Sequence, residues 1–197
     1  MVESSIPRSH ESESREAQRA RLLAWRTSWP AADRLAASAR IVSRLRDLIA
    51  DFRDAGVIAA YWAIRAEPEL PRAEARGYWA GRTLALPRVR ARDEPLEFGL
   101  WHPSSMISLD RWGIGTPEPF EPAEPSLLII PCVGFDRRAY RLGYGGGFYD
   151  RTLAARSVPT VGVAYDQCEL DDFEPQAHDR PLDLIVTESR VIRPSLG

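Results

Sequence analysis

Short apolar runs alternate with helical patterns along the chain, and this alternation restricts the possible folds more than any other feature. Residues 57–62 (Val-Ile-Ala-Ala-Tyr-Trp) and 127–131 (Leu-Leu-Ile-Ile-Pro) are too short for helices and almost wholly apolar, so they predict buried strands. Further strands are expected at 83–86, 160–165 and 183–187. Strands separated by helices predict an α/β fold with a largely parallel sheet.

Helices are expected before and between these strands. A helix over 15–29 precedes a clearer one that begins near Asp33 and that Gly56 ends. One buried stripe is predicted on this second helix, because apolar residues recur at three-, four- and seven-residue steps: Leu35, Val42, Leu45, Ile49 and Phe52. Shorter helices are expected over 71–79 and 148–156.

The domain organisation follows from length and from the absence of linkers. Residues 102–126 are rich in proline, serine and acids and predict a long loop. A chain of 197 residues without an internal repeat predicts a single-domain, three-layer α/β fold with a largely parallel central sheet flanked by helices. We expect a disordered tail over 1–14 and one domain over 15–197.

Composition excludes several classes of function. No apolar run approaches the roughly 20 residues that cross a bilayer, and the first fourteen residues have no pattern of a targeting peptide. Cys132 and Cys168 form no CxxC pattern, and only three histidines are present, so neither a zinc site nor a disulfide framework is expected. The net charge of −2 argues against a nucleic-acid partner. We therefore expect a cytoplasmic protein with no membrane partner.

The glycine segment, residues 141–150 (Arg-Leu-Gly-Tyr-Gly-Gly-Gly-Phe-Tyr-Asp), connects a predicted strand to a predicted helix. Four glycines in five positions allow positive φ angles and a close approach of the backbone to a ligand. The free N–H groups and the dipole of the following helix favour an anion there. The segment therefore predicts a phosphate site, to which Arg141 adds a planar guanidinium.

Two familiar phosphate motifs do not fit this segment. A dinucleotide fingerprint would require glycine at Phe148, and a P-loop would require lysine, which the chain lacks because all 26 basic residues are arginine. A glycine-rich turn without a ligand is the structural alternative. Asp150, in the first turn of the expected helix, suits either a favourable contact with the helix dipole or a Mg²⁺ ligand beside phosphates.

The glycine segment, preceded by Phe135-Asp136, resembles the signature of 5-formyltetrahydrofolate cyclo-ligases, also called methenyltetrahydrofolate synthetases. Phe148 stands where the usual bacterial form has tyrosine. Shorter similarities follow in the family's order over about residues 15–190, namely 61–67, 86–89, 113–119 with two inserted residues, and 178–188.

The resemblance implies that ATP and Mg²⁺ drive closure of 5-formyltetrahydrofolate to 5,10-methenyltetrahydrofolate, with release of ADP and phosphate. Phosphorylation of the formyl oxygen would create the leaving group that N10 displaces, which requires positioning and charge stabilisation but no lysine. The expected partners are these small molecules, and the expected assembly is a monomer.

The resemblance also implies roles for individual residues. Arg141 and Tyr149 are the expected catalytic residues, and Asp150 and Asp179 the expected Mg²⁺ ligands. The expected ATP contacts are Arg15, Arg19, Arg141, Gly143, Tyr144, Gly145, Gly146, Gly147, Phe148 and Tyr149. The expected folate contacts are Trp62, Glu67, Trp112, Tyr144 and Phe148. The structural alternatives are core roles for the two tryptophans and a solvated position for Glu67.

Arg15, Arg19 and Arg26 share one face of the first predicted helix. Like charges four residues apart destabilise a helix, so an anionic partner would explain them. The family has lysine at position 15 and leucine at Gln18, and its residues here contact ATP. A solvated face balanced by Glu11, Glu13 and Glu16 is the alternative.

Two other functions fit the same residues. One is an ATP-using enzyme that acts on another formyl or carboxyl substrate. The other is a non-catalytic folate- or nucleotide-binding paralogue, against which the two carboxylates argue, because simple binding does not require two metal ligands.

Overall fold

The structure is a computed structural model that describes residues 13–52, 56–70, 79, 81–171 and 173–194. Most of the predicted helix over 71–79 and most of the expected tail over 1–14 lie outside these residues.

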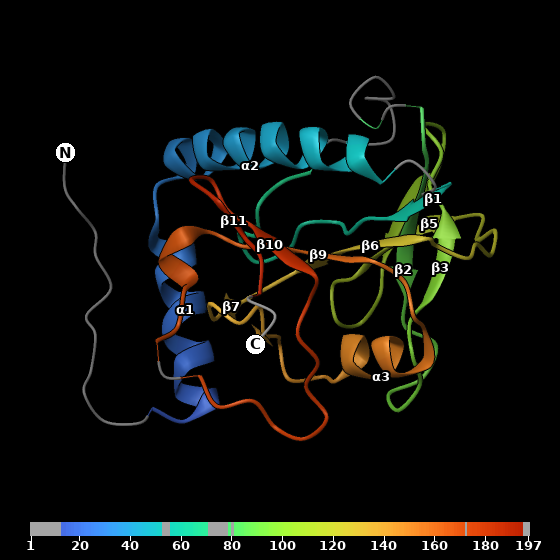
Figure 1. The fold of residues 1–197 in the computed structure, drawn as a ribbon. Helices are drawn as coiled ribbons and strands as arrows, with labels where there is room; N and C mark the ends of the chain where they lie inside the picture. Colours follow the sequence, from blue (N-terminus) through green and yellow to red (C-terminus); the bar gives the residue numbers. More distant parts are fainter. Residues whose placement is uncertain (1–12, 53–55, 71–78, 80, 172, 195–197) are drawn as a thin grey trace.

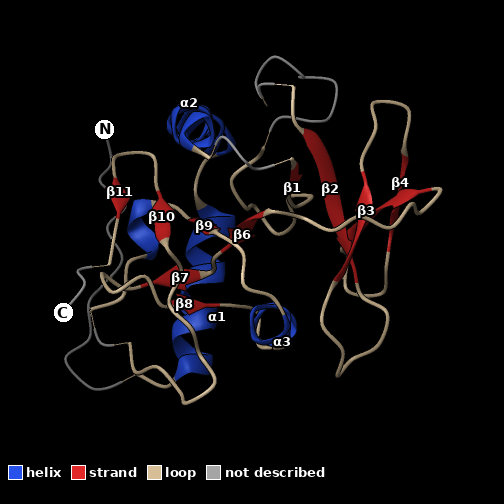
Figure 2. Cartoon of the chain, turned by 45° about the vertical axis from the view of Figure 1, so that its right-hand side comes forward, coloured by secondary structure: helices blue, strands red, loops and turns tan. Residues whose placement is uncertain are grey.

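A seven-stranded sheet forms the centre of the molecule, in the order β11-β10-β9-β6-β1-β2-β3 (Figures 1 and 2). The strands are β1 (Val57–Ala59), β2 (Thr83–Arg88), β3 (Glu97–Leu100), β6 (Leu127–Pro131), β9 (Thr160–Val163), β10 (Leu184–Val186) and β11 (Val191–Ile192). The five inner strands pair in parallel, and only the edge strands β3 and β11 pair antiparallel. The predicted α/β fold with a largely parallel sheet is confirmed.

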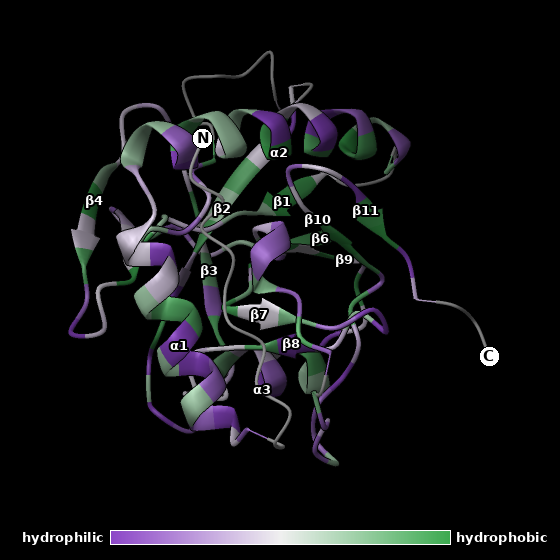
Figure 3. Ribbon diagram, turned by 90° about the vertical axis from the view of Figure 1, so that its left-hand side faces the viewer, coloured by the Kyte–Doolittle hydropathy of each residue, from purple (hydrophilic) through white to green (hydrophobic). Residues whose placement is uncertain are grey.

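Helices cover both sides of this sheet. In Figure 1, α2 (Ala31–Asp51) lies across one face and α3 (Phe148–Ala155) lies on the other, while α1 (Arg15–Ser28) lies at the left of the view. A short 3₁₀ helix covers Asp166–Cys168. The apolar side chains concentrate in the parallel strands, as the hydropathy colours of Figure 3 show. This is the predicted three-layer arrangement.

The buried stripe of α2 differs from the predicted one. Leu45 and Ile49 are buried as expected, but Leu35 is 63% exposed. The buried face consists of Ala37, Ser38, Ile41, Leu45, Leu48 and Ile49. At about 100° per residue, Leu35 points roughly a quarter turn away from this face. The helix also ends at Asp51, before the predicted stop at Gly56.

The prediction of an irregular loop over 102–126 is wrong. The hairpin of β4 (Met106–Leu109) and β5 (Gly115–Glu118) lies within it, and Asp110 closes the turn by accepting hydrogen bonds from the backbone N–H groups of Trp112 and Ile114 (2.8 and 2.9 Å). A second small hairpin, β7 (Gly134–Phe135) with β8 (Arg141–Leu142), leads into the glycine segment, whose first two residues form β8.

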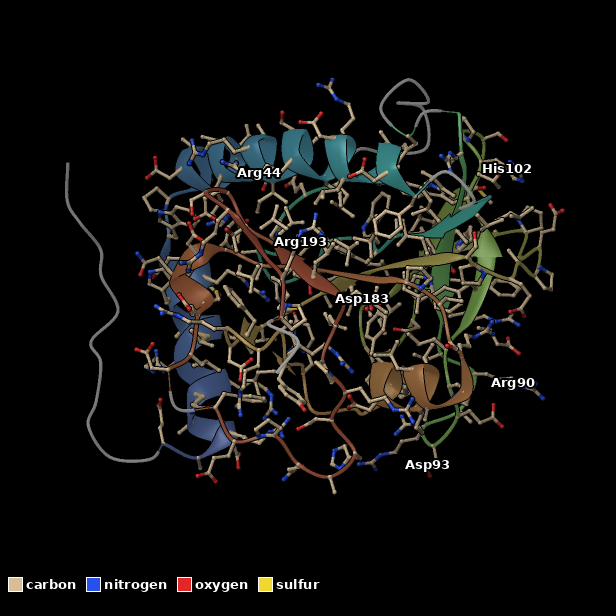
Figure 4. All side chains as sticks on the ribbon, viewed as in Figure 1. Arg44, Arg90, Asp93, His102, Asp183 and Arg193 are labelled. Carbon is tan, nitrogen blue, oxygen red and sulfur yellow. The ribbon has the colours of Figure 1, made fainter. Side chains whose placement is uncertain are left out.

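Side chains connect the outer elements to the sheet. Arg44 on α2 donates to the carbonyl oxygens of Glu188 and Ser189 (2.5 and 2.9 Å), in the turn between β10 and β11. Asp183 accepts from the backbone N–H and the hydroxyl of Thr160 (2.7 and 2.8 Å), which fixes β9 against β10 (Figure 4).

Cys132 and Cys168 lie in the core with free thiols. Burial raises the pKa of each thiol to about 12. Both sulfur atoms are therefore protonated and unreactive at neutral pH. Within the described ranges, no helix combines the length and the apolar character that a transmembrane span requires.

Candidate functional site

A cavity of about 950 Å³ opens where β1 and β6 end. The two strands are parallel neighbours, but their next partners in the sheet lie on opposite sides, β2 beside β1 and β9 beside β6. Such a switch point is the usual place for a ligand in an open α/β sheet. Every residue that the sequence predicts for the site lines this cavity: Arg15, Arg19, Trp62, Glu67, Trp112, Arg141, Gly143, Tyr144, Gly145, Gly146, Gly147, Phe148, Tyr149, Asp150 and Asp179.

The glycine segment presents backbone to the cavity. Gly145 has φ +89°, and Gly147, the N-cap of α3, has φ +67°. Among the described residues no side chain caps α3, so the N–H groups of its first turn lack the usual side-chain acceptor. Arg19 holds the segment, because its Nε donates to the Gly143 carbonyl oxygen (2.7 Å). The result is a concave, positively charged surface suited to an anion.

Two ion pairs lie beside this surface. Arg141 pairs with Asp150 of α3, and Arg15 pairs with Asp179 of the loop before β10. Arg15 and Arg19 therefore face the cavity and are not part of a solvated face. Burial and the neighbouring Arg15 lower the pKa of Arg19, as two like charges close together should. An anion between them would relieve that repulsion.

The carboxylates of Asp150 and Asp179 could hold a metal. One ligand atom each from Asp150, His178 and Asp179 lies within 4.8 Å of the others. Burial would raise the pKa of Asp179, but the hydrogen bonds from Arg15 and the Gln176 N–H keep it below its ordinary value. Two anionic oxygen donors fit Mg²⁺, whereas the imidazole of His178 suits other metals better.

Glu67 is a buried residue that lines the cavity. It is 4% exposed, so the solvated alternative is wrong. The Tyr144 hydroxyl donates to Glu67 Oε1 (2.6 Å), and the Ile64 N–H donates to Oε2 (2.9 Å). Burial raises the pKa of Glu67, and these two hydrogen bonds oppose the rise.

Aromatic rings form the remaining walls of the cavity. Trp62 packs edge-on against Trp101, with ring centroids 5.9 Å apart, and Trp112 packs edge-on against Phe148 at 5.5 Å. Trp112 reaches the site because the β4–β5 hairpin carries it there. Gly115 allows the hairpin to approach, since a Cβ at this position would lie 2.6 Å from Trp62. Both predicted tryptophans thus line the cavity, and Trp62 also packs against the core.

Tyr149 lies in the first turn of α3 and lines the cavity. Burial raises the pKa of its phenol, so the hydroxyl stays protonated and can only act as a neutral donor or acceptor. Arg141, whose side chain is 5% exposed, is fixed by Asp150 and by the Arg180 carbonyl oxygen (3.4 Å).

Sequence reasoning did not assign several residues that the structure brings to the site or next to it. His178 adjoins the predicted Asp179, and Arg26 shares a helical face with Arg15 and Arg19, so both had a signal in the sequence. Arg92 and Arg111 line the cavity from loops, where no periodicity could have indicated them.

Comparisons with known proteins agree on one family. The sequence model of the 5-formyltetrahydrofolate cyclo-ligase family matches residues 11–188. A curated protein named 5-formyltetrahydrofolate cyclo-ligase from Mycolicibacterium smegmatis is 33% identical over 104 residues, covering 50% of this chain and 54% of the relative. Its namesake from Escherichia coli K12 is 38% identical over 100 residues, covering 46% and 54%. The matches thus span about half the length of these curated relatives.

Solved structures extend the likeness over almost the whole chain. The NMR structure of Aquifex aeolicus 5,10-methenyltetrahydrofolate synthetase superimposes with a TM-score of 0.78 at 27% identity, covering 93% of this chain and 94% of that one. The 5,10-methenyltetrahydrofolate synthetase from Mycoplasma pneumoniae gives 0.72 at 23% identity, covering 90% and 100%, which at this identity shows a shared fold.

Proposed function

Because the chain belongs to the 5-formyltetrahydrofolate cyclo-ligase family, we propose that it closes 5-formyltetrahydrofolate to 5,10-methenyltetrahydrofolate while ATP is cleaved to ADP and phosphate, with Mg²⁺ as cofactor. The observation that carries the proposal is the composition of the cavity. Its lining combines the glycine segment, three arginines (Arg15, Arg19 and Arg141) and two carboxylates with Glu67, Trp62 and Trp112. An anion site and an aromatic site in one cavity suit a reaction between ATP and a pterin.

The phosphates of ATP bind at the glycine segment in this proposal. The N–H groups of the first turn of α3 donate to no side-chain cap among the described residues, and they point with the helix dipole toward the cavity. Arg141, Arg19 and Arg15 stabilise the negative charge that spreads over the γ-phosphoryl group during transfer.

Asp150 and Asp179 would hold Mg²⁺, and the ion, when bound, would neutralise charge on the phosphate oxygens. The donor set supports this assignment, because the two carboxylates approach each other from α3 and from a distant loop. Arg141 and Arg15 balance their charge in the structure described here.

The folate binds at the other end of the cavity in this proposal. The carboxylate of Glu67 accepts hydrogen bonds from the N–H groups of the pterin, and Trp62 and Trp112 pack against its planar rings. Phe148 supports Trp112 from the glycine segment, so the two ends of the cavity share a wall.

The reaction then needs positioning above all. The formyl oxygen attacks the γ-phosphorus and ADP leaves. N10 then attacks the activated formyl carbon and loses its proton to water, and the C–O bond breaks to release phosphate. The neutral hydroxyl of Tyr149 can donate a hydrogen bond between the two ends. The planar guanidinium of Arg141 holds the transferred group. We further propose that the protein acts as a cytoplasmic monomer, with residues 15–197 forming one domain.

A direct assay tests the proposal. The purified protein is mixed with 5-formyltetrahydrofolate, ATP and Mg²⁺, and the absorbance of the methenyl product is followed together with ADP. Product should form only with ATP and Mg²⁺ present, with one ADP per product. Product without ATP cleavage, or ATP cleavage without product, would show that the proposed reaction is wrong.

A further inference from the structure

Arg26 is a fully buried charge that the proposed mechanism does not use. Its side chain projects from α1, and the residue is 1% exposed. Its Nε donates to the Arg65 carbonyl oxygen (2.9 Å), and its Nη2 donates to the Tyr144 hydroxyl (2.5 Å). Its Nη1 has no hydrogen-bond partner among the described residues. A guanidinium buried in this way is costly, so its place in the structure needs an explanation.

The contacts of Arg26 fix the direction of a chain of hydrogen bonds. A guanidinium has only donors, so the Tyr144 hydroxyl must accept from Arg26. That hydroxyl has one proton, which it then donates to Glu67 Oε1 (2.6 Å). The other oxygen, Oε2, already accepts from the Ile64 N–H (2.9 Å). Both oxygens of Glu67 therefore act as acceptors, which is the role of the ionised carboxylate.

We propose that Arg26 is a positioning residue, which acts through Tyr144 to hold Glu67 as an oriented anion facing the folate end of the cavity. The inference rests on the proposed function for the identity of the ligand, but the arrangement itself involves only the protein. Tyr144 belongs to the glycine segment and Glu67 follows β1, so the same chain of bonds also joins the two ends of the cavity.

Arg26 is a main source of positive charge near the Glu67 carboxylate, because most other titratable groups around it are neutral. Tyr61, Tyr149 and Cys132 also face the carboxylate, and burial raises the pKa of all three, so they are neutral. The charged groups of the described residues that act on it are Arg26 and Arg65. Since burial already raises the pKa of Glu67, loss of Arg26 or of the Tyr144 hydroxyl must raise it further.

A titration of Glu67 in the free protein tests the inference without any substrate. Protein labelled with ¹³C at the glutamate carboxyl groups is followed by NMR against pH, with the Glu67 resonance assigned by its loss in Glu67→Gln. In Arg26→Gln the midpoint should rise by about one pH unit, and Arg26→Lys, which keeps the charge, should recover part of that rise. Arg21→Gln is the matched control, because Arg21 lies on the same helix but pairs with Glu13 (2.9 Å).

Kinetics supply the second measurement. The acidic limb of the pH profile of kcat/KM for 5-formyltetrahydrofolate should move to higher pH in Arg26→Gln. KM for this substrate should rise about tenfold, which is more than the rise in KM for ATP. If Arg26→Gln does not fold, Tyr144→Phe should produce the same displacement of midpoint and limb. An unchanged midpoint in a folded Arg26→Gln or Tyr144→Phe protein would overturn the inference. If the wild type is inactive but the variants still displace the titration midpoint of Glu67, the proposed function is wrong and the positioning role remains supported.

Discussion

The conformation of the glycine segment depends on the residue type at single positions, and Gly145 is one of them. Its φ of +89° lies in the left-handed region, and an added Cβ would lie 3.4 Å from the guanidinium carbon of Arg19. A side chain there would strain the backbone, and atoms beyond Cβ would crowd Arg19, whose Nε donates to the Gly143 carbonyl. The segment therefore depends on glycine at this position for its conformation as well as for access.

Replacing Gly145 with valine should weaken ATP binding at least about tenfold, because the loss of one charged hydrogen bond alone is worth about 1.5–3 kcal/mol. The fold should survive, since the residue is exposed. Calorimetric titration of ATP checks the affinity, and circular dichroism checks the fold. Gly56→Val is the control, because Gly56 has open space around it and lies outside the cavity. Unchanged ATP affinity in folded Gly145→Val would contradict the phosphate site.

The two carboxylates allow a sharper test. If Asp150 only balanced the helix dipole, Asp150→Asn would cost about 0.3–1 kcal/mol of stability and little activity. As a Mg²⁺ ligand, each of Asp150→Asn and Asp179→Asn should remain folded, lose most activity and need more Mg²⁺. If both hold one ion, the double variant should lose much less than the product of the single losses.

Activity is therefore measured against Mg²⁺ concentration for the wild type, both single variants and the double variant. Asp47→Asn serves as the control, since the Asp47 side chain is 75% exposed on α2, outside the cavity. A folded single variant with wild-type Mg²⁺ dependence would remove its residue from the metal site.

At the scale of elements, periodicity predicted which segments are helices and strands better than it predicted their faces. The strand 127–131 and the helix from Phe148 appear with nearly the expected bounds, because each has a strong apolar or terminal signal. The hairpin in 102–126 could not be predicted, since its strands are short and contain proline, glycine and serine. Its turn depends on one side chain, Asp110, whose bonds are visible only in three dimensions.

Helix α2 offers a direct comparison between the sequence pattern and the structure. Leu45→Ala should destabilise the protein by about 2–5 kcal/mol, because Leu45 is fully buried. Leu35→Ala, in the same helix and the same predicted stripe, should change stability by no more than about 0.5 kcal/mol. Urea unfolding of both variants measures the difference. Equal losses would favour the stripe predicted from the sequence.

At the scale of the whole molecule, the sequence indicated residues that line one cavity but not how they come together. The family resemblance indicated Glu67, Trp112 and Asp179 individually, yet their proximity depends on the strand order and on a hairpin that no pattern predicted. The network of Arg26, Tyr144 and Glu67 could not be predicted, because hydrogen bonds between distant segments leave no periodic trace. From a sequence, the residue types that a reaction needs are therefore easier to identify than the contacts that those residues make.

The two buried thiols have a practical consequence for spectroscopy in solution. Both cysteines of the chain are inaccessible and protonated, so maleimide dyes and nitroxide spin labels have no ready native target. Met106, on the hairpin that carries Trp112, is 73% exposed and lies outside the cavity. A cysteine placed there would be a single attachment point for a reporter, with no need to remove native residues first. Distances from that label to a ligand-borne fluorophore would then follow the hairpin while the cavity fills.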